Sequence, residues 1–510
     1  MKTPSTDLFQ LIQSMSKEER RYFKVTSKTF RRGTGTIYLE LFEAISRQTK
    51  YDEPALKQMF ADRLNDNRFS VAKNYLYHNL LKALCNFQAQ NNLTEKVRQE
   101  LEFVQLLYAR ELYAQAEKHL RKVARLLKGI DHPLLWMEWV EWKFKLHRIN
   151  YYLGLSEKDF HELLGEVEAI QKKLYEYLEV FMGSARFMYQ LTKDGYVRAS
   201  GDFLEEAAKL LEAPIFAGSE KGYSLPAKVK YYNIWGVYNY FKGDYPTSFH
   251  YYEQLFQLVE ENPLLANEQP QFYTGMLFNF GAIALQNRRF DTIQRIILAL
   301  EKMKSGGGRH RSRLFYCLTV LKMRLVLDSF SLEQTGIDLE QTAAEIEQHR
   351  HGLNLLEVYS ILINLTLYAF YKGDFSLALK LLGNILNDRE LHTLPDIHLI
   401  SRLIRLVCHI ELQNYDLVET LGKNIYRSIS NREQKFKLEV LIARAFRKFP
   451  NMRDPRERLP FLEELKQELE ELLNDPEEGR FVQYFDFVSW IESQEKGMRM
   501  VDVIREKMEV

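Results

Sequence analysis

The residues that could carry out chemistry in this chain are sparse and widely separated. His161-Glu162 lacks the second histidine that a zinc-hydrolase helix needs. The chain has no Gly-x-x-x-x-Gly-Lys-Ser/Thr loop, no Cys-x-x-Cys and no Gly-x-Ser-x-Gly. We therefore expect no catalytic activity, no metal site and no cofactor. The polar and charged residues that remain are suited to binding.

Basic residues are concentrated near the N-terminus. Residues 1–88 hold 15 Lys and Arg against 9 Asp and Glu, whereas residues 451–510 hold 9 against 16. Four of the N-terminal basic residues recur three to four positions apart, so a continuous helix would align them in one stripe. They are Arg20, Lys24, Lys28 and Arg31. The stripe fits a solvated helix face, a contact with the acidic C-terminal helices or another partner, or a contact with nucleic acid.

A candidate helix-turn-helix follows the stripe. The sequence predicts helices over 53–64 and 70–88, separated by a polar break at 65–67. The second helix would present Lys73 and Asn74, residue types that contact phosphates and base edges. Leucines committed to packing, and a break longer than the usual turn of that motif, weigh against this interpretation. A regulator with a nucleic-acid-contacting N-terminal unit is therefore the alternative function.

The stretch from Tyr231 to Pro263 carries the clearest structural pattern. It is typical of two amphipathic helices joined by Gly243-Asp244, where glycine can take left-handed backbone angles and aspartate can cap the next helix. Pro246 falls in the first turn of the second helix, where a missing N–H costs nothing. Other stretches look like weaker copies, and none alternates as a strand would, so the sequence predicts an all-α protein.

This hairpin resembles the tetratricopeptide repeat, a helix-turn-helix unit of about 34 residues. Trp235-Gly236 falls at the Leu-Gly pair of that repeat, and Gly243-Asp244-Tyr245 falls at its turn. Ser248 falls where a small residue lets the second helix approach the first. The start of the chain is also similar to that of uncharacterised bacterial proteins with such repeats. The resemblance implies an α-solenoid, a superhelix of helical hairpins.

Further copies extend the resemblance over much of the chain. The clearest runs from Tyr359 to Leu386, with Gly373-Asp374-Phe375 at its turn and Ala378 at the close-approach position. Looser copies surround Tyr113, Phe290 and Tyr415. Because stacked repeats contact only their neighbours, the resemblance predicts an elongated or curved body.

The repeat family lines its concave groove with residues of the first helix. The resemblance therefore implies a groove that presents charged, amide and aromatic side chains from two copies. They are Lys230, Asn233 and Tyr240 from one copy, and Arg98, Gln105 and Tyr108 from another. The copy that begins at Tyr359 places an apolar set at the same positions, which indicates either buried helices or an apolar groove.

Composition sets limits on class and location. Apolar residues make up 46% and charged residues 27%, with a net charge of +1, so no global field attracts nucleic acid or a membrane. Three dispersed cysteines suit a reducing compartment, and no apolar run has the length and purity of a spanning helix. We expect a cytoplasmic protein that does not enter membranes.

These observations divide the chain into three regions. Residues 1–90 are expected to form a basic helical unit, 91–450 degenerate tetratricopeptide-like repeats, and 451–510 acidic helices that cap the array. The function predicted is that of a non-catalytic scaffold or adaptor, which holds a peptide or protein partner in its groove.

Overall fold

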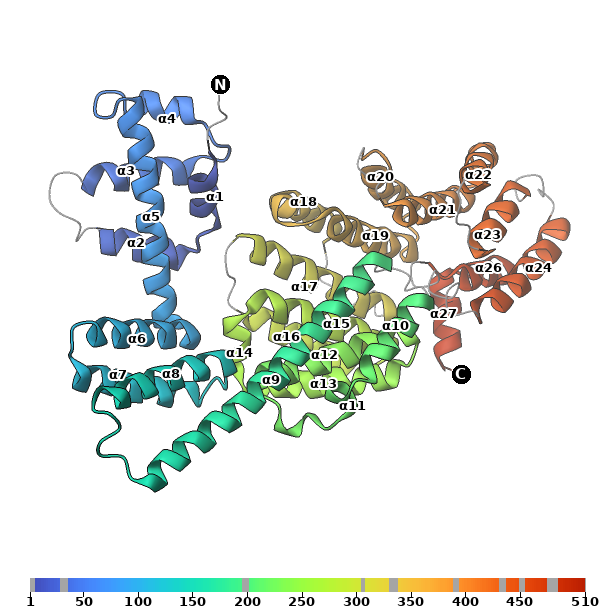
Figure 1. Cartoon of the computed structure of the whole chain (residues 1–510). Coiled ribbons are helices and arrows are strands. Elements are labelled where there is room, and N and C mark those ends of the chain that lie inside the picture. The colour runs from blue at the N-terminus through green and yellow to red at the C-terminus, as the bar shows by residue number, and fades with distance from the viewer. Residues whose placement is uncertain are drawn as a thin grey trace. The chain divides into compact units, whose positions relative to one another are not determined.

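A computed structural model shows an all-helical chain (Figure 1). Every regular element of the residues that it describes is a helix, and none is a strand. This confirms the predicted all-α class. The described residues are 5–27, 35–194, 201–303, 308–329, 338–388, 394–430, 437–448, 455–474 and 485–509.

The chain divides into two compact units. The first comprises Met1–Phe280 with Lys302–Arg311, and the second comprises Gly281–Glu301 with Ser312–Val510. Helices α15 (Pro270–Gln286) and α17 (Gly308–Asp328) contribute residues to both units, as does α16 (Phe290–Lys302) through its last residue. The N-terminal helices belong to the same compact unit as the hairpin at 231–263.

The first unit contains the N-terminal helices and the first hairpins. Its elements are α1 (Asp7–Ser14), α2 (Lys17–Ser27), α3 (Gly35–Arg47), α4 (Glu53–Met59), α5 (Asp66–Asn91), α6 (Leu93–Tyr108), α7 (Tyr113–Leu127), α8 (Pro133–Ile149), α9 (Glu157–Asp194), α10 (Gly201–Leu211), α11 (Pro214–Ala217), η1 (Glu220–Gly222), α12 (Leu225–Lys242), α13 (Tyr245–Glu261) and α14 (Pro263–Glu268).

The second unit contains the remaining hairpins and the C-terminal helices. Its elements are α16 (Phe290–Lys302), α18 (Leu339–His349), η2 (Arg350–Gly352), α19 (Leu355–Tyr371), α20 (Phe375–Leu386), α21 (Pro395–Glu411), α22 (Tyr415–Ser430), α23 (Lys437–Lys448), α24 (Pro455–Leu473), α26 (Phe487–Lys496) and α27 (Met500–Glu509).

Many helices that are consecutive in sequence pack against each other in both units. The most extensive pairs are α6 with α7, α12 with α13, α19 with α20, and α22 with α23. Neighbouring pairs are joined in the same way, as α7 touches α8 and α20 touches α21. Packing of this kind, dominated by neighbours in sequence, is the arrangement that a chain of helical hairpins produces.

The hairpin of α12 and α13 has the turn that the sequence predicts. Gly243 has a φ of +84°, and the Asp244 carboxylate accepts a hydrogen bond from the Thr247 amide at 3.1 Å. The Ser248 hydroxyl donates to the Gly236 carbonyl at 2.7 Å. A Cβ on Gly236 would lie 2.4 Å from the Tyr252 ring. Small residues at these two positions therefore allow the helices to approach closely.

The hairpin of α19 and α20 repeats this turn. Gly373 has a φ of +80°, and Asp374 caps α20 by accepting from the Leu377 amide at 2.9 Å. Ala378 is fully buried, as its close-approach position predicts. Helix α19 is buried on every face between Glu357 and Phe370. Its apolar set at the groove positions therefore belongs to the core of the unit and does not line an open groove.

Several boundaries differ from the sequence-based expectations. Helix α5 begins at Asp66 instead of residue 70, because the Asn65 side chain caps it by accepting from the Arg68 amide at 3.0 Å. Helix α9 is one helix of 38 residues that ends at Asp194, and α10 begins at Gly201. Helix α4 ends at Met59 instead of residue 64, and helix α24 begins at Pro455 and contains Pro460.

Candidate functional site

Helix α12 carries three of the predicted groove residues, which meet two different helices. Lys230 is partly buried, and its Nζ lies 5.1 Å from the centre of the Phe181 ring on α9. Burial lowers the pKa of this lysine. Asn233 accepts a hydrogen bond from the Tyr252 hydroxyl of α13 at 3.3 Å. Tyr240 packs against Tyr245, also of α13.

Helix α6 carries the other three predicted groove residues. Arg98 and Gln105 are exposed, and the Arg98 guanidinium lies 3.5 Å from the Glu95 carboxylate. Tyr108 is partly buried between the rings of Tyr113 and Trp142. Arg98 and Gln105 thus remain available to a partner, whereas Tyr108 packs within its own unit.

Helix α9 exposes an apolar stripe, which was not predicted from the sequence. Its large side chains are between 36% and 69% exposed, although helix faces with this many apolar residues are usually covered. We call these residues, with the exposed Ala185 among them, the α9 stripe. They are Tyr175, Leu178, Phe181, Met182, Ala185, Met188 and Tyr189.

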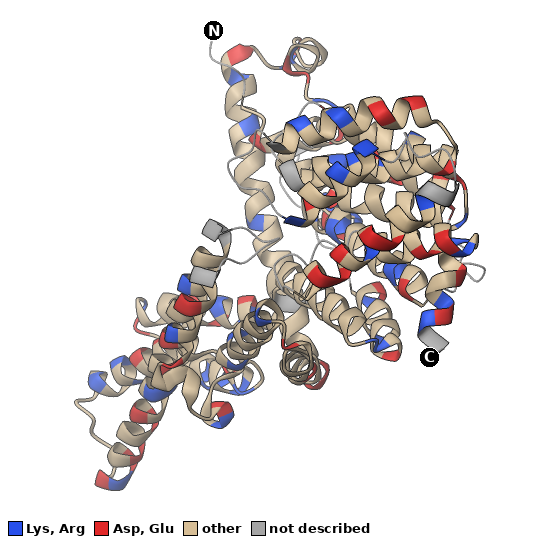
Figure 2. Ribbon diagram, turned by 90° about the vertical axis from the view of Figure 1, so that its right-hand side faces the viewer, with Lys and Arg blue, Asp and Glu red and all other residues tan. Residues whose placement is uncertain are grey.

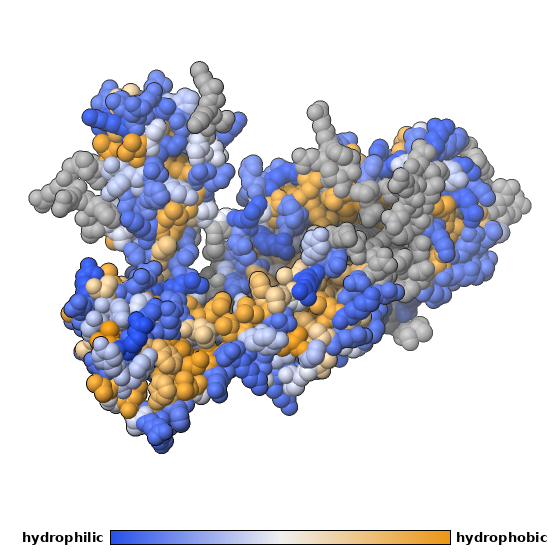
Figure 3. Space-filling model, viewed as in Figure 1, coloured by the Kyte–Doolittle hydropathy of each residue, from blue (hydrophilic) through white to orange (hydrophobic). Residues whose placement is uncertain are grey.

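The opposite face of α9 fixes the helix in the first unit. Val180, Phe187 and Leu191 are buried in a core shared with α10, α11 and α12. A Cβ on Gly183 would lie 2.5 Å from the Phe216 ring of α11, so glycine allows close packing there. In Figure 1 the helix runs diagonally past α12, and Figure 3 shows apolar surface along that course. The stripe is therefore displayed by a helix that is anchored along its other side.

The stripe could not be recognised from the sequence because both faces of α9 are apolar. A helical period in the sequence indicates an amphipathic helix but does not say which of two apolar faces is covered. The signal that could have revealed the stripe is the alternating spacing of three and four residues from Tyr175 to Tyr189.

The basic N-terminal residues are largely engaged within the first unit. The Arg20 guanidinium donates to the Ile12 carbonyl at 2.8 Å, and the Lys24 Nζ lies 3.0 Å from the Glu43 carboxylate. Asn74 is exposed. Lys28 and Arg31 lie outside the described residues.

Lys73 is held by three oxygen atoms. Its Nζ donates to the Glu53 carboxylate at 2.5 Å, the Tyr51 hydroxyl at 2.6 Å and the Ser5 carbonyl at 3.3 Å. The expected presentation of Lys73 on the surface of a recognition helix is therefore wrong, because Lys73 joins α5 to the start of α4. Figure 2 shows basic and acidic residues mixed along the helices of the chain.

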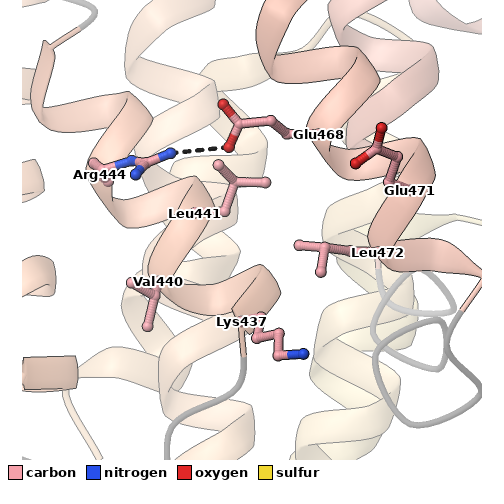
Figure 4. A pocket seen from close by; sticks show the side chains of 7 residues that line it. All are labelled: Lys437, Val440, Leu441, Arg444, Glu468, Glu471 and Leu472. Atoms are coloured by element: carbon pink, nitrogen blue, oxygen red, sulfur yellow. Dashed lines mark hydrogen bonds and ion pairs between the residues drawn. The ribbon is translucent and has the colours of Figure 1, made fainter.

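An open pocket of about 650 Å³ lies between α23 and α24 in the second unit (Figure 4). Lys437 and Arg444 line its α23 side, and Glu468 and Glu471 line its α24 side. The Arg444 guanidinium and the Glu468 carboxylate form an ion pair at 2.9 Å across it. Two of its four charged groups therefore neutralise each other, and the pocket is less suited to a charged ligand than its composition suggests.

The described residues offer no cluster of three or more side chains that could hold a metal ion. Cys317 and Cys408 are buried, and burial raises the pKa of each thiol to about 12, so neither is a ready nucleophile. No helix in the described part of the chain is long and apolar enough to cross a membrane. No protein-family model matches the chain, and no curated protein matches it either.

Proposed function

We propose that this chain is a non-catalytic scaffold that binds another protein chain. Its fold is proposed to be a tetratricopeptide-like superhelix, supported by the glycine turns at Gly243 and Gly373 and by the close approach at Gly236. The dispersed cysteines support a cytoplasmic location as part of the proposal.

The α9 stripe is the observation that carries this function. Exposed apolar patches on soluble proteins mark surfaces that bind other proteins, and aromatic and methionine side chains are enriched in such surfaces. Lys230 lies beside Phe181, so one residue of the predicted groove borders the stripe. The surface proposed for binding therefore includes the stripe and Lys230, and it differs from a groove lined by α12 alone.

The alternative function, contact with nucleic acid, has less support. Arg20 and Lys73 use their charged groups for contacts inside the unit, and Lys24 has an acidic partner. A phosphate would have to compete with these contacts for the same N–H donors. Asn74 remains exposed, but one amide side chain does not supply the charge that phosphate binding needs.

A capture experiment with matched variants tests the proposed function. Wild-type protein, Met182→Glu and Leu298→Glu would be immobilised and exposed to nuclease-treated lysate. Leu298 on α16 is also exposed but lies outside the stripe, so its variant controls for the added charge. We expect wild type and Leu298→Glu to retain a common protein that Met182→Glu loses.

A triple alanine variant at Lys230, Asn233 and Tyr240 adds a second arm to this experiment. Loss of the same protein would extend the binding surface from α9 onto α12. The proposal fails if Met182→Glu, with an unchanged helical circular-dichroism spectrum, retains every protein that wild type retains.

A further inference from the structure

We propose that the α9 stripe pairs with the α9 stripe of a second copy of this chain, with the two helices antiparallel. This inference rests on the proposed function, because it uses the same surface and names the partner. The spacing of the stripe, the fit of its side chains and the charges beside it support this pairing.

The stripe has the spacing of a coiled-coil seam. Tyr175, Leu178, Met182, Ala185 and Tyr189 follow one another at alternating intervals of three and four residues, which correspond to the a and d positions of a heptad. These positions project from one side of the helix, and all five residues are exposed. A second helix can therefore lie along the stripe without moving the core on the opposite face.

In an antiparallel pair, each a position lies level with a d position of the other helix. Met182 would then pack against Ala185 of the second copy, and Leu178 would pack against Tyr189 of the second copy. Each layer occurs twice because the pair has twofold symmetry. A large residue meets a small one in the inner layers, so the two helices can approach closely.

The residues that flank the seam are also complementary in this arrangement. Glu179 and Arg186 lie on the same side of the stripe and carry opposite charges. Antiparallel pairing brings Glu179 of each copy beside Arg186 of the other, which gives two ion pairs. On the other flank, Phe181 of each copy meets Met188 of the other. A parallel pair would instead place Phe181 of one copy beside Arg186 of the other, and neither of these ion pairs would form.

The size of the surface indicates a weak association. The stripe spans about 21 Å of helix, given a rise of about 1.5 Å per residue. Two helices of this length bury less surface than the roughly 1,200–2,000 Å² of a stable complex. We therefore expect a dissociation constant in the micromolar range, about 1–100 μM.

Charge exchange provides a sharp test of the pairing. Glu179→Arg and Arg186→Glu would be studied separately and in an equimolar mixture by sedimentation equilibrium. Each variant alone places like charges together twice, so its dimerisation should weaken by about tenfold. In a heterodimer of the two variants, the two arginines of one copy face the two glutamates of the other, so both ion pairs form again. The double variant Glu179→Arg with Arg186→Glu restores both ion pairs in reversed order.

The double variant should therefore recover the wild-type dissociation constant. Its recovery would also show that neither substitution prevents folding, because both are present in the same chain. An equimolar mixture of the single variants should likewise associate more tightly than either variant alone, because only its heterodimer contains pairs of unlike charge.

Cysteine cross-linking tests the direction of the pairing. Every cross-linking variant would also carry Cys85→Ser, because the exposed Cys85 could otherwise form disulfides of its own. An equimolar mixture of Met182→Cys and Ala185→Cys should form an intermolecular disulfide, whereas Tyr175→Cys alone should not, because the two copies of residue 175 lie at opposite ends of the pair. Efficient cross-linking of Tyr175→Cys would contradict the antiparallel arrangement.

The inference is overturned if the wild-type chain remains monomeric up to about 0.5 mM, far above the expected constant. It is also overturned if the double charge-exchange variant associates no better than the single variants. A monomeric wild type combined with loss of a captured protein by Met182→Glu would leave the proposed binding function standing and remove self-association alone.

Discussion

Single small residues decide how closely the helices of this chain approach. Gly236 faces the Tyr252 ring, and Gly281 faces the Leu321 side chain; a Cβ on either glycine would lie 2.4–2.5 Å from the facing side chain. The repeat pattern identified Gly236 through its place beside Trp235. What it could not identify was the partner side chain, because that depends on how the following helices pack.

Substitution of Gly236 by alanine tests this close approach. Tyr252 is fully buried and its ring lies 2.4 Å from the position of the added methyl group, so the substitution should lower the free energy of unfolding by about 1–3 kcal/mol. Gly165 on α9 has nothing within 4 Å of its Cβ position and serves as the control. Gly165→Ala should be neutral or raise stability by up to about 1 kcal/mol. Urea unfolding of both variants measures the difference, and equal effects would refute the assigned role.

Glu411 is a carboxyl group whose environment favours its neutral form. Burial raises its pKa, and the hydrogen bonds from the Trp490 indole and the Gln494 amide, both 2.7 Å long, only partly oppose this effect. The pKa of Glu411 is therefore higher in the folded protein than in the unfolded chain. Ionisation of Glu411 destabilises the folded protein once the pH rises above the pKa of the unfolded chain.

Glu411→Gln should therefore stabilise the protein at neutral pH. The variant amide oxygen can still accept from Trp490 and Gln494 but carries no charge to desolvate. Its advantage over wild type should be full above the folded pKa and should vanish below about pH 4, where Glu411 is protonated in both states. Thermal unfolding across this pH range measures the advantage, and a variant less stable than wild type at neutral pH would contradict the account.

The N-terminal helices show how contacts distant in sequence limit prediction from the residues. Lys73 and Asn74 are adjacent and were both expected on one exposed surface. The structure separates them, because Lys73 reaches Glu53 and Tyr51, which lie about twenty positions earlier in the chain. No local sequence pattern indicates a partner so far along the chain. Helix caps can be predicted because they depend on residues only three positions apart.

Lys73→Met distinguishes an internal role from a surface role. Methionine keeps the aliphatic stem but removes the closer of the two ammonium groups beside the partly buried Glu53 carboxylate and leaves only Lys57, at 3.6 Å, so stability should fall by about 1–3 kcal/mol. Asn74→Ala, on the exposed neighbour, should leave stability unchanged. The comparison requires only chemical unfolding of the full chain. Unchanged stability in Lys73→Met would return that lysine to the set of surface residues available for binding.

For the whole molecule, the sequence predicts the fold class and the helical turns better than it predicts which surfaces are exposed. The helical class, the turns at Gly243 and Gly373 and the buried Ala378 follow from local patterns and are confirmed. The covered faces of a helix do not follow from such patterns: the sequence left α19 open between buried helices and an apolar groove, because the answer depends on which other helices pack alongside. The α9 stripe belongs to the second kind, and the proposed function depends on it.

Site-specific photo-cross-linking tests the central claim, that this chain binds protein through the α9 stripe. A benzophenone amino acid would replace Met182 in one variant and Leu298 in a control variant, each expressed as the full chain. After irradiation in cells, the account predicts a covalent adduct to protein from position 182, whether to a second copy or to another chain, and none from position 298. The absence of an adduct at 182, or equal adducts at both positions, would contradict the claim.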